Sequence, residues 1–411
     1  MNHLIKSYVL VLATQLTLLP QDAIAQDEGF IYGRVTTEEG RNYEGALRWG
    51  KEEVYWVDMF NSQKEENPNL DYLTREEVYE LRRGRGDWGD NLSVWIGNNW
   101  GDKWGSNTHQ FACQFGDIKK LELYRGDQVR IELRDGTKVD VDGGSNDIGR
   151  KVKIMDPEIG EIELDWDRIE EIEFLPTPKK LERKFGEPLY GTVESDYGLF
   201  TGFVQWDHDE RVSNDKLDGD SYDGDMSIPF GNIKSIENMG SRSEVILKSG
   251  RDMVLRGTND VNGENDGIIV NIEGVGRVDI PWRDFEKVTF KDYPNAGKSY
   301  DDFKKNEDLQ GTVVARGKEF KGRIVYDLDE EYDVEVLQGK IDDMEYIIPF
   351  RNIKSIEPKG YRSSTITLRG GEEIKLEDGQ DVSDRNTGIL VFEKKEPVYI
   401  RWEDVDMITF D

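Results

Sequence analysis

Residues 228–237 read Ile-Pro-Phe-Gly-Asn-Ile-Lys-Ser-Ile-Glu, and residues 348–357 read Ile-Pro-Phe-Arg-Asn-Ile-Lys-Ser-Ile-Glu. The two stretches differ only where Gly231 is replaced by Arg351. A diverged third version, Phe-Gly-Asp-Ile-Lys-Lys-Leu-Glu, occupies residues 115–122. A run this long that returns at a fixed spacing indicates an internal repeat. The sequence therefore predicts three copies of one structural unit.

The likeness continues on both sides of this run. An Asp-Glu step at 209–210 returns at 329–330, and each copy closes on a Trp with a Phe shortly after it. The predicted boundaries follow from these matches: a first copy over 26–176, a second over 186–291 and a third over 308–411, with linkers near 175–188 and 291–308.

The first copy is longer than the other two. The stretch from Gly45 to Phe115 has 42 residues more than the matching stretch from Gly202 to Phe230. This difference predicts an insertion within 58–110.

The hydrophobic pattern within each copy is that of short strands. Residues 129–136, Val-Arg-Ile-Glu-Leu-Arg-Asp-Gly, alternate apolar and polar side chains up to a Gly, and residues 245–250 and 366–370 do the same. Alternation bounded by Gly and Asp predicts antiparallel strands joined by tight turns. Helical periodicity is confined to residues 73–83 and 179–184.

The order of strand, Asp-Gly turn, strand, Gly, strand and closing apolar strand resembles small five-stranded barrels of the Sm-like or SH3-like kind. Residues 133–136 and the Gly-rich stretches around Gly202 and Gly322 carry the resemblance. It implies an all-β chain of three tandem repeats, each made of two small fused antiparallel barrels. The RNA-binding loop residues of Sm-like proteins are not recognisable in this sequence, so RNA binding is not carried over from the resemblance.

The repeated aromatic residues are expected in the core. Trp282 and Trp402 follow alternating apolar residues, and burial of such a side chain stabilises a small barrel by about 1.5–3 kcal/mol. Cys113 lies in a similar alternating run, which predicts a buried, inert thiol. Histidine catalysis is disfavoured, because beyond residue 25 the chain has only His109 and His208, with no patterned nucleophile.

The first 25 residues have the pattern of a secretory signal. Lys6 precedes an apolar stretch that runs to Leu19, and Ala23-Ile24-Ala25 form an A-x-A cleavage site. We therefore expect a periplasmic or secreted protein from which residues 1–25 are removed. A net charge of −31 disfavours nucleic acid as a partner, and no later segment has the length of a membrane span.

An acidic stretch in the second copy is a candidate calcium site. Asp218, Asp220, Asp223 and Asp225 are separated by two or three positions, with Gly residues that allow a flexible oxygen cage. The third copy has a different sequence there, and the EF-hand pattern is not met. A solvated acidic hairpin loop is the favoured interpretation, and calcium binding is the alternative. We expect no other cofactor.

The insertion is the strongest candidate for ligand binding. Trp88, Trp95, Trp100 and Trp104 stand among Gly, Asn and Asp, a composition suited to stacking on sugar rings. Packing of these Trp residues onto their own barrel is an equal alternative. We expect a non-catalytic binding or scaffold protein of the cell envelope, with a polysaccharide or envelope protein as partner. The alternative is a glycan-acting hydrolase with an Asp/Glu acid–base pair.

Overall fold

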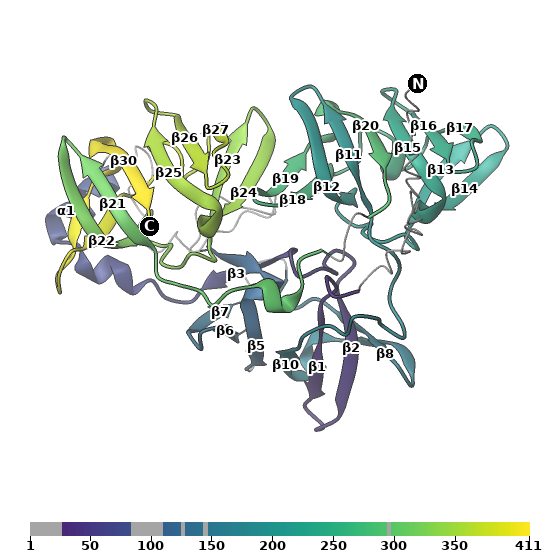
Figure 1. Cartoon of the computed structure of the whole chain (residues 1–411), viewed down its shortest axis with the longest axis horizontal. Helices are drawn as coiled ribbons and strands as arrows, with labels where there is room; N and C mark the ends of the chain where they lie inside the picture. The colour runs from purple at the N-terminus through teal and green to yellow at the C-terminus, as the bar shows by residue number, and fades with distance from the viewer. Residues whose placement is uncertain (1–26, 84–109, 125–127, 143–146, 294–296) are drawn as a thin grey trace, which may run out of the picture.

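The computed structural model describes residues 27–83, 110–124, 128–142, 147–293 and 297–411 (Figure 1). It is all-β, and its strands fall into three consecutive sets of ten, named units 1, 2 and 3 below.

Unit 1 contains β1 (Tyr32–Thr37), β2 (Asn42–Trp49), β3 (Met59–Lys64), η1 (Pro68–Tyr72), α1 (Arg75–Arg83), β4 (Gln110–Gln114), η3 (Phe115–Asp117), β5 (Ile118–Leu123), β6 (Val129–Leu133), β7 (Lys138–Asp142), β8 (Val152–Asp156), β9 (Gly160–Leu164), η4 (Trp166–Arg168) and β10 (Ile169–Phe174). Unit 2 contains β11 (Tyr190–Ser195), β12 (Gly198–Trp206), β13 (Lys216–Ser221), β14 (Gly224–Pro229), η5 (Phe230–Asn232), β15 (Ile233–Asn238), β16 (Ser243–Leu247), β17 (Asp252–Leu255), η6 (Asn259–Val261), β18 (Ile268–Ile272), β19 (Gly276–Ile280), η7 (Trp282–Asp284) and β20 (Phe285–Phe290). The linker helix η8 (Tyr300–Asp302) precedes unit 3, which contains β21 (Gln310–Ala315), β22 (Lys318–Val325), β23 (Val336–Ile341), β24 (Met344–Pro349), η9 (Phe350–Asn352), β25 (Ile353–Pro358), β26 (Ser363–Leu368), β27 (Glu373–Glu377), β28 (Ile389–Phe392), β29 (Val398–Ile400), η10 (Trp402–Asp404) and β30 (Val405–Phe410).

The three units join most of their strands in the same antiparallel pairs. In unit 1 the sheet runs β4-β3-β7-β6-β5-β10-β1-β2-β8-β9. Its last strand, β10, pairs with both β1 and β5, so that Ile172 lies opposite Val35 and Leu121. Val288 and Ile408 have the same double pairing in units 2 and 3. Two groups of strands therefore meet along β10. One group is β3–β7, and the other is β1, β2 and β8–β10, so the first group is inserted in the chain between two parts of the second.

The repeated aromatic residues are in the core, as predicted. Trp49, Trp206 and Tyr326 are fully buried at one equivalent position, and Trp166, Trp282 and Trp402 are buried at another. Cys113 is also buried, and burial raises the pKa of its thiol well above the usual value. Repeated glycines mark close strand approach: a Cβ at Gly202 would overlap the backbone oxygen of Asn271 in the adjacent strand.

Units 2 and 3 lie side by side, and unit 1 lies below them (Figure 1). Strand β19 of unit 2 pairs with β24 of unit 3, so the two units share one sheet and one continuous apolar core. The linker between them crosses unit 1, where Tyr300 packs 4.6 Å from Trp56 and donates a hydrogen bond to the Ile118 carbonyl. Gly116 of unit 1 lies directly under the Phe303 ring.

The insertion connects β3 to β4, at the position of the two-residue turns of β13–β14 and β23–β24. Its described part contacts unit 3: Leu70, Leu73 and Leu81 pack on the cluster of Val325, Leu328 and Leu390. The predicted helix over 73–83 is confirmed as α1.

The short helix predicted over 179–184 was wrong. That segment is irregular, because the N–H of Leu181 donates to the Asp27 carboxylate at 2.8 Å instead of to a helical carbonyl. Within the described residues, no helix has both the length and the apolar character that a bilayer crossing requires. The predicted signal segment, residues 1–25, lies outside the described residues.

Candidate functional site

An equivalent acidic loop follows the second strand of every unit. These carboxylate loops are residues 50–58, 207–215 and 327–335, and each begins directly after the buried aromatic Trp49, Trp206 or Tyr326. The first loop residue has a left-handed backbone, at φ 57° for Gly50, 49° for Asp207 and 47° for Asp327. Asp and Gly tolerate this region better than most residues, so the sharp turn is encoded locally.

The last residue of each loop is an acid that caps the loop's own backbone. One carboxylate oxygen of Asp58 accepts the N–H groups of both Val54 and Tyr55, each at 2.8 Å. Asp215 and Glu335 accept the corresponding pair of N–H groups in units 2 and 3, at 2.7–2.9 Å. The two backbone N–H groups that each carboxylate accepts fix the conformation of its loop.

Each capping acid also binds a cation from another unit. Arg211 of unit 2 donates to Asp58 at 2.6 Å, and Arg48 of unit 1 donates to Asp215 at 2.8 and 3.0 Å. In unit 3, Glu335 lies 2.5 Å from Lys64 of unit 1. The loops are therefore clamps: one carboxylate both closes its own loop and joins two units.

The clamp between units 1 and 2 is reciprocal, because each unit supplies both an arginine and an acid. Arg211 is completely buried, its guanidinium lies 4.8 Å from the centre of the Tyr55 ring, and that ring stacks on Phe203 at 5.5 Å. Asn271 completes the hydrogen bonding of Asp58 at 2.9 Å. Buried ions require this degree of pairing, because an unpaired charge in a dry interior is strongly destabilising.

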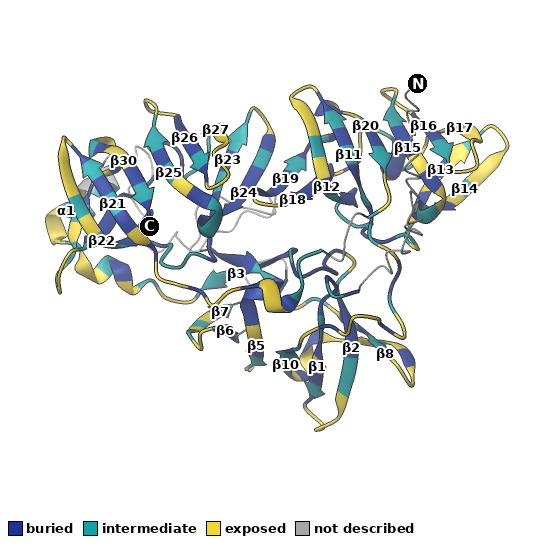
Figure 2. Cartoon of the chain, in the orientation of Figure 1, coloured by how far each residue is buried: buried dark blue, intermediate teal, exposed yellow. Residues whose placement is uncertain are grey.

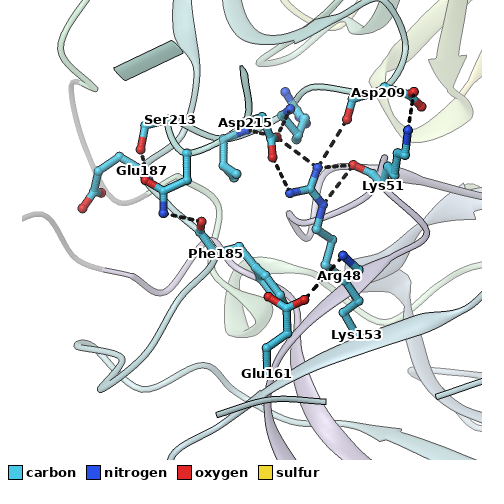
Figure 3. Close-up of polar contacts among 12 residues, drawn as sticks. Arg48, Lys51, Lys153, Glu161, Phe185, Glu187, Asp209, Ser213 and Asp215 are labelled. Atoms are coloured by element: carbon cyan, nitrogen blue, oxygen red, sulfur yellow. Dashed lines mark hydrogen bonds and ion pairs between the residues drawn. The ribbon is translucent and has the colours of Figure 1, made fainter. Parts of the chain in front are cut away.

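Figure 3 shows the other half of this contact, where Arg48 lies between Asp215 and the backbone of its own loop. Its Nε donates to the Lys51 carbonyl at 2.9 Å, and Lys51 itself reaches Asp209 of unit 2 at 3.2 Å. The Arg48 side chain is 10% exposed, whereas that of Lys51 is 72% exposed. The Arg48–Asp215 ion pair therefore stabilises the contact between units 1 and 2 more than the Lys51–Asp209 pair does, since exposed ion pairs contribute little to stability.

A second acidic pair accompanies each loop: Glu53 with Asp147, Glu210 with Asp260, and Glu330 with Asp381. The aspartate of each pair accepts a backbone N–H from the strand that follows the loop, at 2.6 Å in all three units. The backbone carbonyl of the same aspartate accepts a hydrogen bond from the indole N–H of the buried Trp, or in unit 3 from the hydroxyl of the buried Tyr. These aspartates therefore fasten the core aromatic and the next strand together.

The glutamates of these pairs have raised pKa values. Burial, together with Asp147 and Glu52, raises the pKa of Glu53 well above its usual value. Burial and the nearby Asp260 raise the pKa of Glu210 to about 9, and burial raises that of Glu330 in the same direction. In all three units, burial therefore favours the neutral, protonated form of this glutamate.

The tightest convergence of acids in the described residues is in unit 1. One oxygen from each of Glu52, Glu53 and Asp147 lies within 4.8 Å of the others. Arg150 approaches Glu52 at 3.7 Å, and Arg277 of unit 2 lowers the pKa of Glu53 against the effect of burial. Protein cations thus offset the charge of this group.

The four candidate calcium-binding acids lie elsewhere, on the β13–β14 hairpin. Asp218, Asp220, Asp223 and Asp225 are all exposed, and they do not belong to the convergent group in unit 1. Calcium binding by them stays a prediction. The predicted glycan-binding residues Trp88, Trp95, Trp100 and Trp104 lie outside the described residues.

Sequence reasoning missed the clamps, although their signal was present. The Asp-Glu step shared by the second and third copies is the centre of the loop, and in the first copy it is Glu52-Glu53. The capping acid stands nine positions after the buried aromatic in all three copies. Acid-rich runs were interpreted as solvated loops, and nothing local reveals that a cation from another unit meets them. Comparison of the chain with known protein families and with curated proteins finds no match.

Proposed function

We propose that the chain is an exported, non-catalytic binding or scaffold protein of the cell envelope, built from three copies of one unit of two fused SH3-like barrels. The observation that carries the proposal is the use of the loop acids. In every unit the capping carboxylate is engaged with backbone amides and with a cation from another unit. Because the capping carboxylates bind cations of other units, they hold the three units in one fixed arrangement, as a scaffold requires.

The insertion is the proposed ligand-contacting part, through Trp88, Trp95, Trp100 and Trp104. Three hydrogen bonds join its two described ends to unit 3. Near the N-terminal end of the insertion, Asn67 and Asn69 donate to Leu328 and Glu331 of unit 3, at 2.9 and 2.8 Å. At the C-terminal end, Gln110 accepts from Gln338 of unit 3 at 2.8 Å. A Trp-rich segment tethered at two fixed points suits contact with an extended glycan or with peptidoglycan.

Sedimentation with purified peptidoglycan and binding to polysaccharide arrays test this proposal. We expect the full chain to bind, and a Trp95→Ala/Trp100→Ala/Trp104→Ala variant to lose at least about tenfold in affinity, since stacked aromatics dominate such contacts. The matched control is Tyr222→Ser, which removes an aromatic side chain that is 99% exposed on another hairpin. Equal binding by all three proteins would exclude the insertion as the contact.

The hydrolase alternative is favoured by one observation, the convergence of Glu53 and Asp147. A buried glutamate with a raised pKa is typical of a general acid. However, the two residues are only 7% and 1% exposed, and Asp147 is hydrogen-bonded within the fold. Release of reducing sugar ends from a glycan by the full chain, abolished by Glu53→Gln, would establish the enzyme and overturn the scaffold proposal.

A further inference from the structure

The three units contain the same β-hairpin in three different settings. In unit 3, β23–β24 is paired on its outer edge, because β24 binds β19 of unit 2. In unit 1, β3–β4 is covered by unit 3, where Met59 and Ala112 pack with Val336 and Ile347. In unit 2, within the described residues, β14 pairs only with β13. Within the described residues the outer strands of two hairpins, β4 and β14, therefore have no strand partner on their outer edge. Of these two, the β3–β4 hairpin is the one that packs against unit 3.

The β19–β24 pair shows how this edge accepts a strand. Arg277, Val278 and Asp279 lie antiparallel to Ile347, Tyr346 and Glu345. The approach is so close that a Cβ at Gly276 would overlap the Ile347 carbonyl oxygen.

The corresponding edge of β14 presents unpaired backbone groups. Ser221 and Gly224 flank the two-residue turn, and Asp220 lies opposite Asp225. Because hydrogen-bonded and non-hydrogen-bonded pairs alternate along an antiparallel ladder, the N–H groups of Asp225 and Ser227 face away from β13. These positions match Glu345 and Ile347, which face β19. An edge of this kind is a template for an added strand.

The side chains around this edge determine what kind of strand fits. Asp218, Asp220 and Asp225 share the outer face of the hairpin with Ser227, and all four are exposed. Met226 and Ile228, on the opposite face, pack against the core of unit 2. Figure 2 shows the β13–β14 hairpin at the end of the molecule with its tip exposed. An added strand would meet negative charge on one face and apolar surface on the other.

We propose that the outer edge of β14 binds an extended segment of a partner protein in which cationic residues alternate with apolar ones. The cationic side chains lie over Asp218, Asp220 and Asp225, the apolar ones continue the face of Met226, and the backbone pairs with Asp225 and Ser227. Self-association through β9, the unit 1 counterpart of β19, is disfavoured. It would bring Glu161 and Glu163 of a second copy to the same acidic edge. This inference does not depend on glycan binding by the insertion.

The test uses the full chain and a short fluorescent peptide of alternating lysine and valine. We expect saturable binding by fluorescence anisotropy, and slowed amide exchange in 224–229 by mass spectrometry. A peptide of alternating glutamate and valine should not bind. Ser227→Pro removes one outward N–H while leaving the β13 ladder, because proline is tolerated at such edge positions. This substitution should abolish both the binding and the protection.

Two further variants keep the test decisive if Ser227→Pro fails to fold. Asp218→Asn/Asp220→Asn/Asp225→Asn should weaken peptide binding by about threefold to a hundredfold, because each of the three exposed ion pairs contributes only modestly to affinity. The control Glu170→Gln/Glu286→Gln/Glu396→Gln removes the same charge from exposed positions elsewhere and should bind normally. Equal weakening by the two triple variants, binding without protection of β14, or no binding would each overturn the proposal. Protection of 224–229 by self-association of the chain would instead identify a second copy as the occupant.

Discussion

The β13–β14 and β23–β24 hairpins follow equivalent clamped loops and end in the same Ile-Pro-Phe sequence, but of the two only β23–β24 pairs with a strand of another unit. Their inner faces are alike: Leu217 and Leu337 are both fully buried. The outer faces differ, since Asp218 and Ser227 stand where unit 3 has Gln338 and Ile347. The comparison teaches that the inward residues specify the hairpin, whereas the outward residues decide what lies against it.

The largest effect is expected from the clamp that supports the paired hairpin. Lys64→Met leaves Glu335 buried without its cation, and the side chain of Glu335 is only 1% exposed. Loss of one partner of a buried pair costs about 3–5 kcal/mol. Arg48→Met at the loop before β13 should cost less, because the side chain of Asp215 is 18% exposed and water can solvate part of its charge. Denaturant unfolding of both variants measures the difference, and a larger loss for Arg48→Met would contradict it.

Two glycines allow the paired edge and the free edge to be compared: Gly276 begins β19, and Gly224 begins β14. Gly276 and Gly224 each have positive φ, at 142° and 123°. Gly224→Ala should cost only the backbone strain, about 1–3 kcal/mol, since nothing lies within 4 Å of a Cβ there. Gly276→Ala adds the overlap with Ile347 and should be the more destabilising of the two in thermal unfolding. Equal losses would mean that the β19–β24 contact relaxes without cost.

Burial of Glu210, in the loop before the free hairpin, predicts a pH dependence with a definite sign. Its pKa is raised to about 9 in the folded chain, so the folded state retains a proton that the unfolded state releases near the ordinary pKa. Stability from this group is complete below about pH 4.5 and is lost as the pH rises towards 9. Glu210→Gln, which mimics the neutral acid, should match the parent at low pH and be the more stable at pH 9.

Thermal unfolding of the parent and the Gln variant across this range measures the effect. The comparison removes the contributions of all other titrating groups, which the two proteins share. A constant difference in melting temperature from pH 4.5 to 9 would show that Glu210 is charged in the folded state.

The sequence predicted the strands and the buried aromatics because both depend on local alternation, which is visible in residues such as Val129 and Ile131. It did not predict the clamps, because Asp58 and Arg211 are far apart in the chain and only the folded contact reveals their pairing. For Asp218 and Asp225 the sequence favours a solvated acidic hairpin loop, with a calcium site as the alternative. Their alternation on two paired strands, rather than their number, places them on one outer face.

The smallest expected effect concerns one cross-strand pair. Asp220 lies opposite Asp225 in the free hairpin, whereas Lys340 lies opposite Glu345 in the paired one. Like charges directly opposite are destabilising and opposite charges are stabilising, by about 0.2–1 kcal/mol. Asp225→Lys should therefore raise the melting temperature slightly. Lys340→Asp should lower it by a similar amount, and the double-mutant cycles with Asp220→Asn and Glu345→Gln isolate each pair. If Asp225→Lys destabilised the chain, the acidic face would have a stabilising structural role, and like-charge repulsion across the hairpin would be the wrong account of it.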